Sequence, residues 1–186
     1  MTPRFDKLLV LDIDETLIHA TEKPLPRPPD FCVGRYPIYK RPKVDPFLSA
    51  CFEWFTVGVW TSSSGDYASE ILKHLLPKSG SIAFLMARDR CTPKLDPISG
   101  QGQWIKNLKK VERAGYPLEK VIVVDDSPEK HVLNYGNLVR IAEYVGDPSD
   151  NELPALLRYL ELLGSVENVR AVEKRGWRSS PVVRAN

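Results

Sequence analysis

Three apolar runs along the chain end abruptly in polar side chains. They are residues 7–14 (Lys-Leu-Leu-Val-Leu-Asp-Ile-Asp), residues 56–61 (Thr-Val-Gly-Val-Trp-Thr) and residues 121–126 (Val-Ile-Val-Val-Asp-Asp). Continuous apolar runs of this length are typical of strands that are covered on both faces, as in parallel sheets. Residues 82–86 and 138–141 are weaker strand candidates. The pattern therefore predicts a buried parallel sheet.

Apolar residues recur at helical spacing between these runs, over residues 44–54, 66–76, 105–114 and 151–163. Strands that alternate with helices predict the α/β class. More specifically, they predict a doubly wound parallel sheet whose crossover connections are right-handed.

Two stretches interrupt the alternation. Residues 24–42 carry prolines at positions 24, 26, 28, 29, 37 and 42, so this stretch cannot form a helix. Residues 91–103 are rich in proline, glycine and serine, and we expect a loop or short hairpin there. The 186 residues fit one compact domain, which we expect to span residues 1–170. Residues 171–186 are polar and are expected to form a loosely ordered tail.

The charge balance argues against some classes of partner. The chain has 26 basic and 24 acidic residues, a formal net charge of +2, which disfavours nucleic acid or an anionic membrane as a partner. No apolar run approaches the ~18 residues of a membrane span. The three cysteines lack paired spacing, which indicates free thiols in a reducing compartment. We therefore expect an intracellular protein, cytoplasmic or, in a eukaryote, nuclear.

The polar residues that follow the apolar runs are candidates for a functional site. Ligands of an open parallel sheet bind beyond the carboxyl ends of its strands, near the switch in strand order. The candidates are Asp12, Asp14 and Thr16 after the first run, Thr61 and Ser62 after the second, and Asp125 and Asp126 after the third. Carboxylates ~4 Å apart repel by roughly 4 kcal/mol per pair at an effective dielectric near 20, so a cation is expected among them. Mg²⁺, which prefers oxygen ligands and phosphate groups, fits best.

The segment Asp12-Ile-Asp-Glu-Thr16 matches the DxDxT signature of phosphatases of the haloacid dehalogenase (HAD) superfamily. Over roughly residues 7–170 the chain resembles more closely the branch that contains the small RNA polymerase II C-terminal-domain phosphatases (FCP/SCP, NLI-interacting-factor-like). The resemblance rests on six ordered blocks, at residues 9–19, 40–48, 60–61 with 67–68, 88–91, 104–108 and 124–128. It implies a Rossmann-like HAD core for residues 1–170, with a small insertion. The short stretch between Thr16 and Thr61 leaves little room for a large cap domain.

The resemblance also implies catalytic roles. Asp12 would be the nucleophile that forms an aspartyl-phosphate, and Asp14 the general acid and base. A carboxylic acid at position 14 favours hydrolysis, because dehalogenases and ion-pumping ATPases of the superfamily lack one there. The metal ligands would be Asp12, Asp126 and, through its backbone carbonyl, Asp14.

Further residues would hold the phosphoryl group of the substrate. Thr61, Ser62 and Lys106 would contact its oxygens, and Thr16 would secure the turn that carries Asp14. Asp125 would orient Lys106 or a metal-bound water. Lys94 is a competing candidate for the lysine.

The expected substrate is a phosphorylated protein or peptide at serine or threonine, because a site without a lid suits a phosphate on a large molecule. In the resembled branch, a β insertion offers an apolar pocket to a proline-containing peptide. Phe31, Val33, Tyr36 and Tyr39 are candidates for such a pocket, or else packing residues.

Two alternative functions remain open at this point. The first is a phosphatase of small metabolites or nucleic-acid ends, which would use the same chemistry. The second is a receiver-like phospho-acceptor domain, which combines similar residues in another order. In a receiver the acidic pair ends the first strand and precedes the hydroxyl and the lysine, whereas Asp125 and Asp126 follow Thr61 and Lys106.

Overall fold

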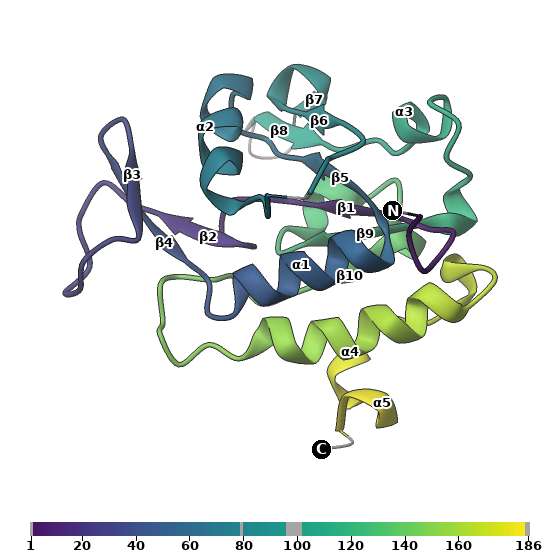
Figure 1. Cartoon of the computed structure of the whole chain (residues 1–186). Coiled ribbons are helices and arrows are strands. Elements are labelled where there is room, and N and C mark those ends of the chain that lie inside the picture. Colours follow the sequence, from purple (N-terminus) through teal and green to yellow (C-terminus); the bar gives the residue numbers. More distant parts are fainter. Residues whose placement is uncertain (1, 79, 96–101, 185–186) are drawn as a thin grey trace.

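The computed structural model describes residues 2–78, 80–95 and 102–184. Its centre is a five-stranded sheet in the order β10-β9-β1-β5-β6, in which each neighbouring pair is parallel (Figure 1). The strands are β1 (Leu8–Leu11), β5 (Thr56–Trp60), β6 (Leu85–Met86), β9 (Val121–Asp125) and β10 (Leu138–Arg140). The predicted parallel sheet is confirmed.

Both faces of the sheet are buried, which explains the continuous apolar runs. Leu9 and Leu11 of β1 pack in a cluster with helices α1 (Val44–Trp54), α2 (Gly65–Leu75) and α4 (Glu152–Ser165). Leu8 and Val10, which point the opposite way, pack in a second cluster that includes residues in and beside α3 (Lys109–Glu112). Because successive strand residues face opposite sides, a strand covered on both sides must be apolar throughout.

One predicted helix is much shorter than expected. The predicted helix over residues 105–114 is helical only at Lys109–Glu112, because Ile105 belongs to a strand and pairs with Thr92. The other three predicted helices agree with the structure to within two residues at each end. Among the described residues, no helix combines the length and the apolar character needed to cross a membrane.

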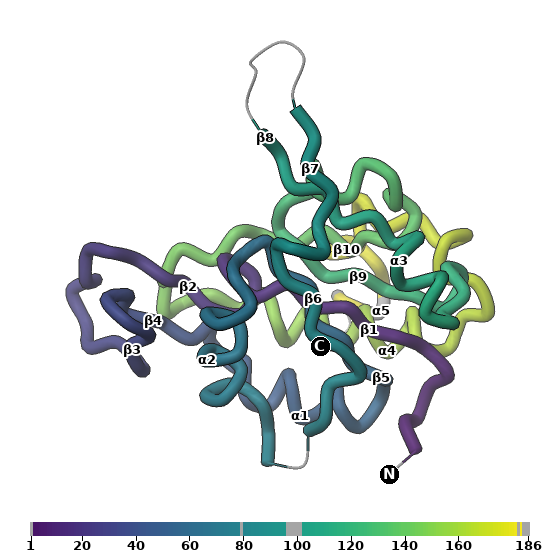
Figure 2. The backbone as a smooth tube through the Cα atoms, turned by 90° about the horizontal axis from the view of Figure 1, so that it is seen from above, coloured from purple at the N-terminus to yellow at the C-terminus, as the bar shows by residue number. Residues whose placement is uncertain are grey.

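Two small β elements are inserted into this core. The proline-rich segment supplies β3 (Phe31–Val33) and β4 (Tyr36–Lys40) of a three-stranded antiparallel sheet, which β2 (Ile18–Ala20) completes, beyond the carboxyl end of β1 (Figure 1). A hairpin of β7 (Thr92–Leu95) and β8 (Gly102–Ile105) projects from the body in Figure 2. Residues 96–101, within the expected loop or hairpin, lie outside the described residues. No large cap domain is present in the described part of the chain.

Short 3-10 turns complete the connections. They are η1 (Arg88–Arg90), η2 (Leu118–Lys120), η3 (Pro128–His131), η4 (Tyr135–Asn137), η5 (Val169–Ala171) and η6 (Trp177–Ser179).

The C-terminal segment is packed, so the expectation of a loosely ordered tail was wrong for its described part. Trp177 is 2% exposed and stacks on Tyr159 of α4 with ring centroids 5.6 Å apart. Its Nε1 donates a hydrogen bond to the Arg140 carbonyl at 2.8 Å. The last element of the described chain is α5 (Pro181–Arg184). The buried Trp177 ring therefore helps to anchor a segment whose polar composition predicted loose order. The domain boundary at residue 170 stays a prediction.

Candidate active site

The polar residues that end the central strands lie side by side. Leu11 of β1 pairs with Val59 of β5 and with Val124 of β9, so Asp12 emerges between the ends of these two strands. The Asp12 backbone N–H continues the ladder and donates to the Val124 carbonyl at 3.1 Å. After β1 the sheet first extends on one side with β5 and β6 and then on the other side with β9 and β10. Open α/β sheets bind ligands at such a switch in strand order.

Asp12 is a buried carboxylate held between two lysines. It is 2% exposed, and its Oδ1 lies 2.8 Å from Lys106 Nζ. Its Oδ2 lies 3.9 Å from Lys130 Nζ. Burial and the neighbouring Asp125 raise the pKa of Asp12 to about 7, against the opposing effect of the two lysines. A further cation near Asp12 would therefore favour its ionised form.

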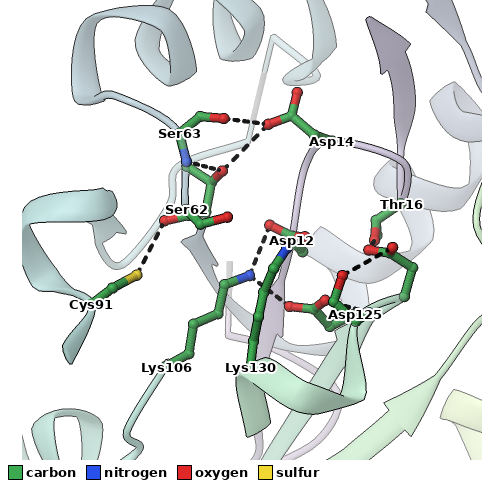
Figure 3. A network of polar contacts seen from close by, with 12 residues as sticks. Asp12, Asp14, Thr16, Ser62, Ser63, Cys91, Lys106, Asp125 and Lys130 are labelled. Carbon is green, nitrogen blue, oxygen red and sulfur yellow. Dashed lines mark hydrogen bonds and ion pairs between the residues drawn. The ribbon is translucent and has the colours of Figure 1, made fainter. Parts of the chain in front are cut away.

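Asp125 stays ionised and fixes the position of Lys106. It accepts a hydrogen bond from Lys106 Nζ at 2.6 Å and lies 2.9 Å from His131 Nε2. Burial alone would raise the pKa of Asp125, but Lys106 and His131 outweigh it and hold the pKa well below its usual range. Burial also opposes the charge on Lys106, yet Asp12 and Asp125 together raise the pKa of this lysine. Lys106 thus remains a cation that bridges two carboxylates (Figure 3).

His131 also contacts the Asp125 carboxylate, and its imidazole ring is neutral. Burial lowers its pKa below the usual value, so the imidazole is uncharged near neutral pH. A neutral ring close to an ionised carboxylate donates its proton, which assigns the N–H to Nε2. His131 therefore fixes Asp125 without adding positive charge.

Three carboxylates form a group that can hold a metal ion. Asp12, Asp125 and Asp126 each offer an oxygen, and these atoms lie within 4.8 Å of one another. Asp126 is oriented by Thr16 Oγ1, which donates to its Oδ1 at 3.3 Å, and by Ser127 Oγ at 3.1 Å from Oδ2. Burial and Asp125 raise the pKa of Asp126. All donors are hard oxygen atoms that carry excess negative charge, which fits a divalent cation.

Asp14 lies outside this group and faces different partners. Ser63 Oγ donates to its Oδ2 at 2.7 Å (Figure 3). Tyr67 OH donates to its Oδ1 at 2.8 Å. Burial and the charge of Asp14 raise the pKa of Tyr67, so the phenol stays protonated as a donor. The Asp14 carboxylate is thereby oriented from α2 and from the loop before it. A metal contact through its backbone carbonyl stays a prediction.

Thr61 and Ser62 begin the loop that leads from β5 to α2. Thr61 is 1% exposed, and its Oγ1 accepts a hydrogen bond from the Ser63 backbone N–H at 3.0 Å. The Ser62 carbonyl accepts one from Arg88 Nε at 2.7 Å. The loop therefore presents hydroxyl groups beside Asp14 in a fixed turn. Lys94, the competing lysine candidate, is exposed on β7, whereas Lys106 is buried in the cluster.

The family model described as NLI interacting factor-like phosphatase matches residues 7–170 of the chain. This chain belongs to the NLI interacting factor-like phosphatase family. The match extends from the start of β1 to the turn after α4, so the family's domain includes every residue of the cluster described above.

Relatives within the NLI interacting factor-like phosphatases are similar over most of the chain. A probable C-terminal domain small phosphatase of Dictyostelium discoideum is 36% identical, over 89% of this chain and 53% of the relative. The human carboxy-terminal domain RNA polymerase II polypeptide A small phosphatase 1 is 33% identical, over 90% of this chain and 63% of the relative. The chain thus spans about half to two-thirds of the length of these relatives.

Solved structures agree on the fold. The structure of Fcp1, described as an essential RNA polymerase II CTD phosphatase, superposes with a TM-score of 0.54. The match has 21% sequence identity and covers 89% of this chain and 52% of that one. At this identity the similarity concerns the fold alone.

Sequence reasoning missed four residues of this NLI interacting factor-like phosphatase site: Ser63, Tyr67, Lys130 and His131. A signal existed for Tyr67, because it belongs to the block of residues 60–61 with 67–68 and lies at the start of a predicted helix, and Ser63 follows Thr61 by two residues. Lys130 and His131 belong to η3, a single turn that brings the chain back over the ends of the strands. A single turn of this length is too short to show a periodic pattern in the sequence.

Proposed function

We propose that this chain is a Mg²⁺-dependent phosphatase of phosphoserine or phosphothreonine in proteins, with Asp12 as the nucleophile. The observation that carries the proposal is the buried Asp12 carboxylate, which lies 2.8 Å from Lys106 Nζ and within a group of three carboxylates. A buried anion among anions is unfavourable unless cations balance it. An incoming phosphate ester with a divalent cation meets that requirement.

The reaction takes place in two displacements. A carboxylate oxygen of Asp12 attacks phosphorus and forms an aspartyl-phosphate, while Asp14 gives its proton to the departing serine or threonine oxygen. Water then attacks the phosphorus, Asp14 takes a proton from that water, and the bond to Asp12 breaks to release inorganic phosphate. Ser63 and Tyr67 orient Asp14 for both proton transfers through the hydrogen bonds at 2.7 and 2.8 Å.

The remaining residues bind and neutralise the phosphoryl group. Lys106 keeps its charge, because Asp12 and Asp125 raise its pKa against the effect of burial, and it faces the oxygens that gain negative charge. Thr61 and Ser62 supply hydroxyl groups at the end of β5. Mg²⁺, when bound by Asp12 and Asp126 with Asp125 beside them, would supply further charge neutralisation and alignment.

A polypeptide is the substrate class that the surroundings of the site favour. The small antiparallel sheet stands beside the site, and Tyr36 of β4 packs edge-on against Tyr67, with ring centroids 6.5 Å apart. Phe31 stacks on His74 of α2 at 4.2 Å. Phe31, Val33 and Tyr36 are half-buried and form the proposed peptide-binding surface. Tyr39, the fourth candidate, is fully buried and is a packing residue.

The names of the two relatives support the same substrate class, because one refers to a C-terminal domain small phosphatase and the other to the carboxy-terminal domain of RNA polymerase II. A substrate such as the C-terminal domain of RNA polymerase II would also fit an intracellular location for this chain. The three cysteines Cys32, Cys51 and Cys91 are free thiols, as expected for a reducing compartment.

Phosphopeptide hydrolysis tests the proposal directly. The intact chain should release phosphate from a phosphoserine peptide and from an aryl phosphate when Mg²⁺ is present. Chelation should stop both reactions, and excess Mg²⁺ should restore them, because the carboxylate cluster repels phosphate in the absence of the cation. Phosphate release that continues in excess chelator would contradict the proposed use of the cluster.

Proton release on metal binding is a second expected result. Burial and Asp125 raise the pKa of Asp12 to about 7, and only the ionised carboxylate binds a cation. At pH 6 the binding of Mg²⁺ should release up to about one proton from Asp12, and at pH 8.5 almost none. Titration calorimetry in buffers of different ionisation enthalpy measures this number.

Glu15 provides the control for that measurement. Burial and Asp14 raise the pKa of Glu15 to about 8, so it is a further carboxyl group near the site, besides Asp12 and Asp126, that is able to release a proton. The Glu15→Gln variant should retain the release at pH 6. If the release disappeared with Glu15, the assignment to Asp12 would be wrong.

A further inference from the structure

A basic groove lies outside the carboxylate cluster, between the edge strand β10 and the C-terminal segment. Its volume is about 910 Å³. Five cationic side chains line it, and Glu173 is the acidic residue of the lining. The cations are Arg140, Arg170, Lys174, Arg175 and Arg178. This concentration of charge contrasts with the near-neutral chain, whose net charge is +2.

Hydrogen bonds between the C-terminal segment and the region around β10 fix the shape of the groove. Lys174 is buried and donates from Nζ to the carbonyls of Gly136 and Val172, each at 2.8 Å, and to that of Val169. The bond to Gly136 joins the C-terminal segment to the turn that precedes β10, and the other two bonds lie within that segment. At the other end, Trp177 Nε1 donates to the Arg140 carbonyl. The groove is therefore built before any ligand arrives, which lowers the cost of binding.

Two of the arginines form no ion pair with the described residues. Arg175 is paired with Glu173 at 2.7 Å, and Arg178 is paired with Glu152. Arg140 and Arg170 are exposed and form no ion pair with the described part of the chain. A guanidinium group binds a phosphate through two parallel N–H···O bonds. Arg140 and Arg170 thus offer an anion site that no side chain of the described structure fills.

The groove borders the active site. Arg140 pairs with Asp125 across the β9–β10 register, and neighbouring strands lie roughly 4.8 Å apart. Pro128, which follows Asp126 by two residues, lines the groove. A single extended segment can therefore reach both places, since it advances roughly 3.3 Å per residue.

We infer that this groove binds a second phosphoryl group of the same polypeptide whose first phosphoryl group is hydrolysed at Asp12. The inference rests on the proposed function. It specifies the substrate class further, as a protein segment with phosphorylated residues a few positions apart. Arg140 and Arg170 are the residues that recognise the second group.

Paired peptides test this inference. Each peptide carries one phosphoserine, and its partner carries in addition a non-hydrolysable phosphonate two to five residues away on either side, so that only one ester is cleaved in both. We expect kcat/KM of the intact chain to be about five- to tenfold higher for the best doubly charged peptide. In the double variant Arg140→Ala, Arg170→Ala this ratio should fall to about one. Because the readout is a ratio, a loss of folded protein affects both peptides equally.

Arg113→Ala is the matched control, because Arg113 is exposed and does not line the groove. It should keep the ratio of the intact chain. A ratio near one in the intact chain, or a ratio that survives in the double variant, overturns the inference.

Direct binding separates this inference from the proposed function. If the intact chain hydrolyses no phosphopeptide, the proposed function fails, and fluorescence anisotropy of the labelled doubly charged peptide still tests the groove. Binding weakened about five- to tenfold in the double variant supports the groove. If the double variant instead loses binding to a single-stranded oligonucleotide or to phosphatidylserine vesicles and keeps peptide binding, the groove has another occupant and the inference is wrong.

Discussion

Replacement of Asp12 by asparagine is expected to abolish turnover and, at the same time, to stabilise the metal-free fold. Turnover of a phosphoserine peptide should fall by about 10⁴-fold or more, because an amide is not a nucleophile and the remaining residues only bind and align. The stabilisation has a separate cause. The pKa of Asp12 is raised from 3.8 to about 7, first by burial and then by Asp125.

The sign of the stability change follows from that pKa. An acid whose pKa is higher in the folded state than in the unfolded state destabilises the fold when it is ionised. This cost is absent below pH 4 and is fully present above pH 7. At pH 8 without metal, Asp12→Asn should therefore raise the free energy of unfolding by on the order of 2–4 kcal/mol, and the gain should shrink as the pH falls from 7 to 4.

Urea unfolding in excess chelator at pH 8 and at pH 5 measures both effects. Added Mg²⁺ should stabilise the wild-type protein more than the variant, because a ligand stabilises the state that binds it. Asp6→Asn is the control, since Asp6 is an exposed carboxylate paired with Lys120 and its removal should give no gain. An Asp12→Asn protein that is less stable than wild type at pH 8 would show that its lysine partners outweigh its burial.

The central strands and the acidic residues at their ends were predictable from the sequence, because burial of the sheet on both faces determines where the apolar runs begin and end. A strand covered on both faces is apolar throughout, as Leu8 to Leu11 are, and the first polar residue after it marks the edge of the sheet. Asp12 and Asp125 are such residues. The resemblance to the family added the roles that pattern alone does not assign.

Sequence reasoning missed residues of the site for two different reasons: Lys130 and His131 lie on a short turn without a periodic signal, whereas Tyr67 lies on a predicted helix whose pattern assigns it no role. Lys130 reaches Asp12 from a 3-10 turn, and Tyr67 reaches Asp14 from the first turn of α2. The short α3 has a different cause: Ile105 has helical spacing but pairs with Thr92 in the hairpin, because pairing between strands overrides local preference. Arg140 and Arg170 line the same groove, although they are far apart in the sequence, because the packing of Trp177 and the hydrogen bond of Lys174 to Gly136 place the C-terminal segment beside β10.

Lys106→Met should cost more stability than any other single change at the site. Lys106 is 1% exposed, and its Nζ lies 2.8 Å from Asp12 and 2.6 Å from Asp125. Methionine fills a similar volume but leaves two buried carboxylates without their main cation. Loss of one partner from a buried ion pair costs about 3–5 kcal/mol, and we expect a loss of that order in the free energy of unfolding at pH 8 without metal. Turnover should be lost as well, because the phosphoryl oxygens lose the same charge.

The pH dependence of this loss identifies its origin. Asp12, whose pKa is already about 7, should take up a proton at pH 5 in the variant, so the destabilisation should be smaller there than at pH 8. Lys130→Met is the matched control, because Lys130 lies 3.9 Å from Asp12 and its side chain is 23% exposed. An ion pair of that kind contributes about 0–1 kcal/mol. Equal losses for the two lysine variants, or a loss for Lys106→Met that does not change with pH, would mean that packing rather than charge makes Lys106 necessary. In that case the burial of Asp12 beside Lys106 would need a different explanation.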